Sequence, residues 1–300
     1  MTSSPAIAAK AVLAKGITRQ FPIPSCSLGV DDLDRLFRIL QKKASEAADE
    51  QVAGLQQQAG QTAQQFNQGK ESLRSLLNLV VRVQGTDGEW TAANTADPIR
   101  EDSLPLSIAS IQYDSSFLFR GQFNTYPQNN FLVTLDFTRT GILDLTNLSA
   151  APGPNQSDAV VSGVNITWVN AVTQELRAFF EQRSAARGWL YSPYAYDLLV
   201  LTIGFPVSFN LVYHFDKILR PVLKLPDALF VALYVYLVLV VLLGFRLIFN
   251  YAKWVLPKIE GPSRRHGAPR LHKTILAAVA LTLMARLITS FLWILGIHLH

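Results

Sequence analysis

Cysteine is nearly absent from this sequence: Cys26 is the only one among 300 residues. A single thiol forms no intrachain disulfide and cannot supply a metal site made of several cysteines. The scarcity also fits a reducing compartment, where disulfides are rare. We therefore expect neither a disulfide framework nor a cysteine metal centre.

Catalytic and cofactor-binding motifs are also lacking. The sequence contains no HExxH, GxSxG or paired-cysteine motif, and the stretch GVDDLDRL from Gly29 lacks the lysine and the spacing of a phosphate-binding loop. The histidines lie in or beside the apolar C-terminal third: His214, His266, His272, His298 and His300. His298 and His300 are close enough in sequence to share a metal, but such a terminal pair is more often solvated. We expect no cofactor and no metal, and we lean against an enzyme.

Two groups of polar side chains can each be interpreted either as a binding site or as ordinary solvated surface. Asp114 and Asp136 fall on separate predicted strands and can face a cleft, although carboxylates on a solvated sheet face are the more ordinary arrangement. A second group is either a ligand surface or a solvated strand and turn: Arg120, Gln122, Asn124 and Tyr126.

The composition divides the chain in two. Residues before about 190 mix polar and apolar side chains, whereas the chain beyond Tyr194 is strongly apolar, with its charges gathered between apolar runs. An apolar helix of about 20 residues crosses a hydrocarbon core of about 30 Å. The sequence therefore predicts an all-α transmembrane bundle of three helices within residues 188–300. Their approximate bounds are 194–215, 226–248 and 274–297. The first contains Pro206 and Asn210, which leaves a buried or interfacial helix as its alternative.

A basic loop follows the second apolar segment. It contains a single acid, Glu260, and the following cations: Lys253, Lys258, Arg264, Arg265, Arg270 and Lys273. Cytoplasmic loops are enriched in lysine and arginine, so this loop is a topology signal rather than a nucleic-acid patch. The N-terminal stretch is broken by Lys10 and makes no convincing signal peptide. With three spans, we expect the N-terminal domain and this loop in the cytosol, and the C-terminus on the opposite side.

Aromatic and charged residues mark the expected membrane boundary. Tyrosine and tryptophan prefer the headgroup layer, and the predicted aromatic belt comprises Trp189, Tyr191, Tyr194, Tyr196 and Trp254. The alternative is that some of these rings pack under the soluble domain. Asp197 and Arg246 fall at the same boundary and are predicted to pair.

Arg286 lies near the middle of the third apolar segment. At about 1.5 Å per residue it sits roughly 18 Å from the cytosolic face, and Asn210 roughly 20 Å. Tyr234 falls at a similar level. A mid-membrane arginine costs about 3 kcal/mol, so we predict that these three residues form one intramembrane polar layer. Snorkelling or local bilayer thinning is the alternative.

The N-terminal part reads as a flexible tail at 1–15 and an α+β cytosolic domain at 16–187. A helical segment at about 31–77 is either one long helix or two helices broken near Gly54 or Gly60, with a coiled coil as the alternative to packing on the domain's own sheet. FLVTLDFT, residues 131–138, alternates apolar and polar side chains as a strand with one wet face does. FLFRGQF, residues 117–123, is another predicted strand, and residues 168–183 a closing helix. The order implies an antiparallel sheet with helices on one face.

These expectations favour a membrane protein whose cytosolic domain binds a ligand or protein partner and is anchored by, or signals to, the bundle. The alternative is an effector whose oligomerised helices permeabilise the bilayer, and a membrane-associated enzyme is the third. The expected partners are the lipid bilayer, a second copy of the chain, or a protein or small-molecule ligand, and no nucleic acid.

Overall fold

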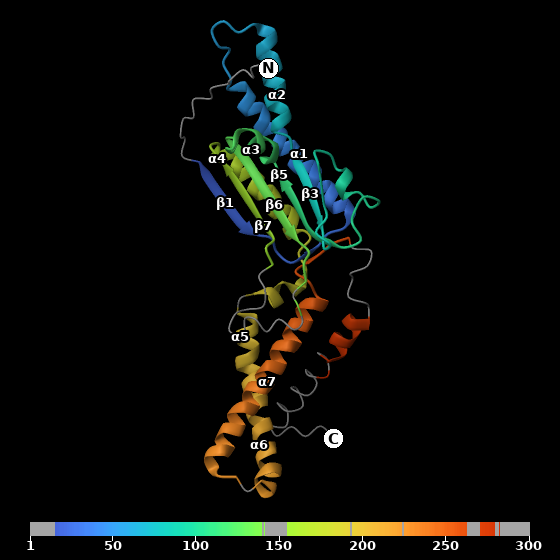
Figure 1. Ribbon diagram of the computed structural model, residues 1–300, viewed down its shortest axis with the longest axis vertical. Coiled ribbons are helices and arrows are strands. Elements are labelled where there is room, and N and C mark those ends of the chain that lie inside the picture. Colours follow the sequence, from blue (N-terminus) through green and yellow to red (C-terminus); the bar gives the residue numbers. More distant parts are fainter. Residues whose placement is uncertain are drawn as a thin grey trace.

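The computed structural model describes residues 16–139, 141, 155–192, 194–223, 225–262, 271–279 and 282. A sheet with its covering helices forms one end of the molecule, and a pair of long helices forms the other (Figure 1). The predicted tail at 1–15 lies outside the described residues. The chain therefore has the α+β part and the helical part that the sequence predicts, in that order.

The α+β part is built on a six-stranded antiparallel sheet in the order β1-β7-β6-β5-β3-β4. The strands are β1 (Ile17–Pro22), β3 (Val80–Gly85), β4 (Trp90–Ala93), β5 (Ile108–Asp114), β6 (Asn129–Asp136) and β7 (Asp158–Gly163). In β6, Phe131, Val133 and Leu135 are buried, while the residues between them are partly exposed. This alternation confirms the predicted strand with one wet face.

Helices cover the buried face of the sheet (Figure 1). They are α1 (Val30–Ala53) and α4 (Ile166–Glu181), with α2 (Ala63–Leu76) extending beyond the sheet beside α1. Leu36 of α1 and Leu176 of α4 are fully buried in the same apolar core as β6. Gly54 ends α1. Thr62 caps the start of α2, where its hydroxyl accepts a hydrogen bond from the Gln65 amide. The long segment is therefore two helices.

The prediction of a strand at FLFRGQF is wrong, because these residues form helix α3 (Phe117–Phe123). The Asp114 carboxylate accepts hydrogen bonds from the amide and the hydroxyl of Ser116, both at 2.8 Å, and turns the chain as β5 ends. Asn124, with φ of 52°, ends the helix in the left-handed conformation. Local side-chain hydrogen bonds here outweigh the strand-like composition.

Two helices of the described residues, rather than the predicted three, are long and apolar enough to cross a bilayer. The first, Ala195–Val222, comprises α5 (Ala195–Leu199), the π-helical turn η3 (Val200–Gly204) and α6 (Phe205–Val222). The second is α7 (Asp227–Val255). Only 11% and 6% of their most apolar windows is buried, unlike the core helices of a soluble protein. Residues 271–279 are helical, and most of the predicted third span lies outside the described residues.

Small residues bring the two long helices together. Gly204 is buried, and a Cβ atom there would lie 3.3 Å from Leu242 of α7. One turn later Ser208 is fully buried, and its hydroxyl donates to the Gly204 carbonyl at 2.6 Å. Small residues at such spacing permit close helix packing in membranes. The two helices form an antiparallel hairpin (Figure 1).

Candidate functional site

The end of α7 is joined to the α+β part by a short second sheet. Strand β8 (Ile259–Glu260) pairs in parallel with β2 (Cys26–Ser27). The Cys26 amide donates to the Lys258 carbonyl at 3.1 Å, and the Leu28 amide to the Glu260 carbonyl at 2.8 Å. The chain that leaves the helical hairpin therefore returns to the domain it came from. We call this β2–β8 pairing the joint.

The chain after α7 contacts the α+β part. Ile259 is 2% exposed and belongs to the same apolar core as the sheet. Its neighbours Lys258 and Glu260 accept the two backbone hydrogen bonds of the joint. The first half of the predicted basic loop is correspondingly a helix end and a strand. A strand of two residues is too short to produce a recognisable alternation in sequence.

Arg187, from the 3-10 turn Ala186–Tyr191, ties the joint together. One guanidinium nitrogen donates to the Cys26 carbonyl at 2.7 Å and to the Ser27 hydroxyl at 2.9 Å. Another lies 3.2 Å from the Glu260 carboxylate, whose second oxygen accepts from Lys273 at 2.9 Å. Burial raises the pKa of Glu260, but Lys273 and Arg187 outweigh it, and the net pKa lies below the ordinary value. Glu260 is therefore ionised at neutral pH.

Tyr191 fastens the last turn of α7 from the same side. Its hydroxyl lies 2.7 Å from the Leu256 carbonyl and 3.1 Å from the Lys253 carbonyl, two groups that the helix end leaves unpaired. Burial raises the pKa of the Tyr191 phenol, so the proton that makes these bonds is retained at neutral pH. Burial also raises the pKa of the Cys26 thiol to about 11. Cys26 is thus a neutral packing residue rather than a nucleophile.

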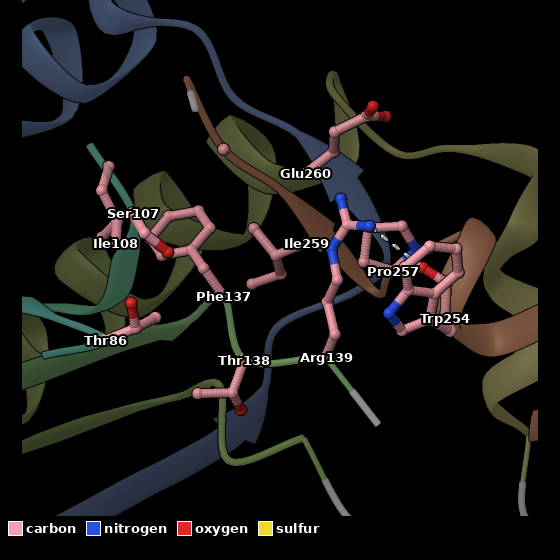
Figure 2. Close-up of a pocket in the computed structure, with 11 residues that line it drawn as sticks. Thr86, Ser107, Ile108, Phe137, Thr138, Arg139, Trp254, Pro257, Ile259 and Glu260 are labelled. Atoms are coloured by element: carbon pink, nitrogen blue, oxygen red, sulfur yellow. Dashed lines mark hydrogen bonds between the residues drawn. The ribbon is translucent and has the colours of Figure 1, made fainter. Parts of the chain in front are cut away.

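A cavity of about 440 Å³ lies beside the joint. Its lining comes from the β3–β4 turn, the start of β5, the chain after β6, the end of α7 and β8 (Figure 2): Thr86, Ser107, Ile108, Phe137, Thr138, Arg139, Trp254, Pro257, Ile259, Glu260 and Gly261. A Cβ atom at Gly261 would lie 2.6 Å from the Phe137 ring, so a larger residue there would require the ring to move. We call this space the junction cavity, because both parts of the chain line it.

Arg139 is the cation of the junction cavity. Its guanidinium lies 5.5 Å from the centre of the Trp254 ring and donates to the Trp254 carbonyl at 3.4 Å. Burial lowers the pKa of Arg139, and the nearby Glu260 carboxylate opposes this effect. An arginine nevertheless remains charged at neutral pH. Arg139 therefore presents a partly buried positive charge beside apolar walls.

The residues of the predicted aromatic belt differ in their surroundings. Tyr191 bonds to the end of α7, and Trp254 lines the junction cavity, as described above. The centre of the Tyr196 ring lies 5.2 Å from that of the Phe249 ring. Trp189 and Tyr194 are 61% and 75% exposed. These positions fit both sequence interpretations, since some rings pack under the domain and others project outward.

The predicted basic loop is divided. The Lys253 ammonium is buried and lies 5.0–5.1 Å from the ring centres of Tyr191 and Phe249. Lys258 supplies a carbonyl to the joint, and Lys273 pairs with Glu260. Arg264, Arg265 and Arg270 lie outside the described residues.

The predicted pair of Asp197 and Arg246 stays a prediction. Arg246 is 2% exposed and lies in α7, and Asp197 lies in α5.

Two residues of the predicted intramembrane layer, Tyr234 and Asn210, are among the described residues. The Tyr234 hydroxyl donates to Asp216, which also pairs with Arg220 at 3.2 Å. Asn210 is exposed. Arg286 lies outside the described residues, so its place in a polar layer stays a prediction.

The polar groups on the sheet mainly stabilise turns. Arg120 bonds to Asp114 at 3.1 Å and to the Tyr126 hydroxyl at 3.0 Å, closing a network around α3. Asp136 accepts hydrogen bonds from the amides of Thr138 and Gln156. Gln122 and Asn124 are exposed. His298 and His300 lie outside the described residues, within which no group of three or more metal-binding side chains occurs.

Sequence reasoning missed Arg139 and Arg187, the two residues that give the junction its chemistry. Neither belongs to a motif. Two partners of Arg187 lie 160 or 161 residues earlier in the chain, and the third, Glu260, lies 73 residues later.

No known protein family, curated protein or solved structure matches the chain.

Proposed function

We propose that this protein is a membrane-anchored binding protein in which a cytosolic α+β domain is rigidly coupled to a transmembrane hairpin. A ligand held at the junction cavity would bias the orientation of the domain relative to α7. The observation that carries the proposal is the joint, in which the chain beyond the hairpin becomes a strand of the soluble domain.

The surface of the hairpin supports the membrane part of the proposal. Large apolar side chains project from both helices, among them Phe209 at 61%, Val235 at 56% and Leu239 at 58% exposure. So many large apolar side chains exposed along two helices are unusual on soluble monomers and are typical of surfaces covered by lipid or by a partner. The lengths of both helices suit the hydrocarbon core.

The joint supports the proposed topology. A hairpin that crosses the bilayer twice returns residues 256–262 to the side of the α+β domain, where β8 pairs with β2. The cations of the basic loop then favour the cytosol for that side. The two-span hairpin alone is sufficient for this arrangement.

The hydrogen bonds of the joint support coupling rather than tethering. A flexible linker is usually rich in glycine and serine and makes few contacts, whereas this connection includes backbone pairing and the bonds of Arg187 and Tyr191. A ligand shifts a conformational equilibrium only by binding one state more tightly than another. An occupant of the junction cavity would contact both parts and would meet that condition.

Cysteine labelling tests the topology. We expect a membrane-impermeant maleimide to label Gln84→Cys and Leu271→Cys from the same side of sealed vesicles, and Leu225→Cys from the other, in a Cys26→Ala background. All three sites are exposed, Leu225 lies between α6 and α7, and Leu271 lies near the end of the basic loop, two residues before Lys273. Labelling of Gln84→Cys and Leu271→Cys from opposite sides would contradict the two-span topology, and release of the protein by alkaline carbonate would contradict the membrane anchor.

A further inference from the structure

We infer that the junction cavity binds a phosphate group attached to an apolar body, with Arg139 as its counter-ion. Both a lipid headgroup and a soluble phosphate compound have this chemistry. The inference rests on the proposed function, because it names the class of ligand that would act at the junction.

The ion pairs around the cavity leave Arg139 apart. Arg183 pairs with Asp32 at 2.6 Å, and Arg187 with Glu260 at 3.2 Å. Within the described part of the chain, Arg139 is in none of the ion pairs; it donates to the Trp254 carbonyl and lies beside the Trp254 ring, and the Glu260 carboxylate acts on it only from beyond ion-pair distance. Burying a charge is costly unless another charge or good hydrogen bonds compensate it. A ligand anion would provide that compensation.

Glu260 also lines the cavity, but it does not make the site acidic. Its two carboxylate oxygens are occupied separately by Arg187 and Lys273. Together with Arg139, these side chains carry three positive charges against one negative charge at the junction. The local balance therefore favours an anion.

The walls suit the rest of such a ligand. Figure 2 shows the Arg139 side chain with Phe137 and Ile259 on one side and Trp254 on the other. Ile108 and Pro257 extend the apolar lining, and Thr86 and Ser107 add hydroxyl groups. Ligand sites typically combine mainly apolar walls with a few polar groups that fix orientation. Guanidinium groups bind phosphate with two parallel hydrogen bonds, which makes Arg139 the orienting group here.

The position of the cavity agrees with this ligand class. Trp254 lies in the last turn of α7, where the chain leaves the proposed membrane helix. Tryptophan at such a position marks the headgroup layer, which is also where lipid phosphates lie. In the proposed topology, the cavity therefore lies at the level of the headgroups, where anionic amphiphiles are concentrated.

A binding experiment with the full chain in neutral detergent tests the inference. The probes are a short-chain phosphatidic acid, the diacylglycerol of the same chain length, and inorganic phosphate. We expect saturable binding of phosphatidic acid, no saturable binding of diacylglycerol, and a Kd raised by about tenfold or more in Arg139→Gln, as loss of a charged hydrogen bond implies. Arg139→Lys should retain part of the affinity because it keeps the charge.

Arg177→Gln is the matched control. Arg177 also lies over an aromatic ring, that of Phe21 at 5.1 Å, but it does not line the cavity. The Kd of Arg177→Gln for phosphatidic acid should equal that of the unchanged protein. Equal losses in the two glutamine variants, binding of diacylglycerol as tight as that of phosphatidic acid, or absence of saturable binding would overturn the inference. Inorganic phosphate binding as tightly as phosphatidic acid would identify a soluble phosphate as the source, and weaker binding a lipid.

These outcomes are separable from failure of the proposed function. If the labelling pattern is as expected but Arg139 does not affect binding, only the ligand class is wrong. If Arg139-dependent binding is observed but the labelling pattern fails, the cavity binds an anion in a protein whose topology differs from the proposal.

Discussion

Replacing Ile259 with alanine is expected to lower the free energy of unfolding of the α+β domain by about 2–5 kcal/mol. Ile259 follows the long hairpin in sequence, yet it is 2% exposed within the core of the sheet domain. The truncation removes buried methyl groups and leaves a cavity that the surrounding side chains fill only in part. Chemical denaturation of the full chain in detergent, followed by tryptophan fluorescence, measures the change.

Ile275→Ala is the control for that substitution. Ile275 is 43% exposed in the helical residues 271–279 and lies in the same C-terminal part of the chain. Its replacement should change the unfolding free energy by less than about 0.5 kcal/mol. Equal effects of the two substitutions would mean that Ile259 does not pack in the domain, and the joint would then be wrong.

Arg187→Gln is expected to lower the free energy of unfolding by about 2–3 kcal/mol, because the charged hydrogen bonds from Arg187 to the Cys26 carbonyl and to Glu260 are lost together. Glu260 keeps Lys273 as a partner, which limits the loss. The exposed pair of Arg100 and Asp97 provides the control, and Arg100→Gln should cost less than about 0.5 kcal/mol. Denaturation at neutral pH measures both changes.

The effect of Arg187→Gln should also depend on pH. The folded-state pKa of Glu260 lies below its ordinary value of 4.5, so ionised Glu260 adds stability above that value. This contribution is lost as the pH falls through the folded-state pKa. The difference in unfolding free energy between the unchanged protein and Arg187→Gln should therefore shrink in acid. It should not vanish, because at low pH the unchanged protein still has the hydrogen bond from Arg187 to the Cys26 carbonyl, which the variant lacks. A difference that grows in acid would contradict the assigned ion pair.

Periodic features of the fold could be predicted from the sequence. The alternation in residues 131–138 identified β6, and the uncharged run after Asp227 identified α7, since both patterns extend over several residues. The strand predicted at FLFRGQF was wrong because composition does not reveal the turn that Asp114 forms with Ser116.

The candidate site was less predictable, for a physical reason. The joint has two residues in each strand, and its stabilising contacts join residues that are far apart in sequence. Single-sequence patterns report local periodicity and carry no information on such pairings. The charge asymmetry of the 251–273 loop leads us to expect that loop in the cytosol, but it gave no indication that the carbonyls of Lys258 and Glu260 would accept hydrogen bonds from the amides of Cys26 and Leu28.

Rigid coupling between the α+β domain and α7 is tested most directly by a pulsed electron-spin distance measurement on the full chain in lipid nanodiscs. Spin labels at Gln84→Cys in β3 and Val240→Cys in α7, in a Cys26→Ala background, report the orientation of the domain relative to the hairpin; both positions are exposed. We predict a single narrow distance distribution that broadens when Arg187→Gln is added, whereas Arg100→Gln leaves it unchanged. A broad distribution in the chain with its joint intact would show a flexible tether and contradict the account.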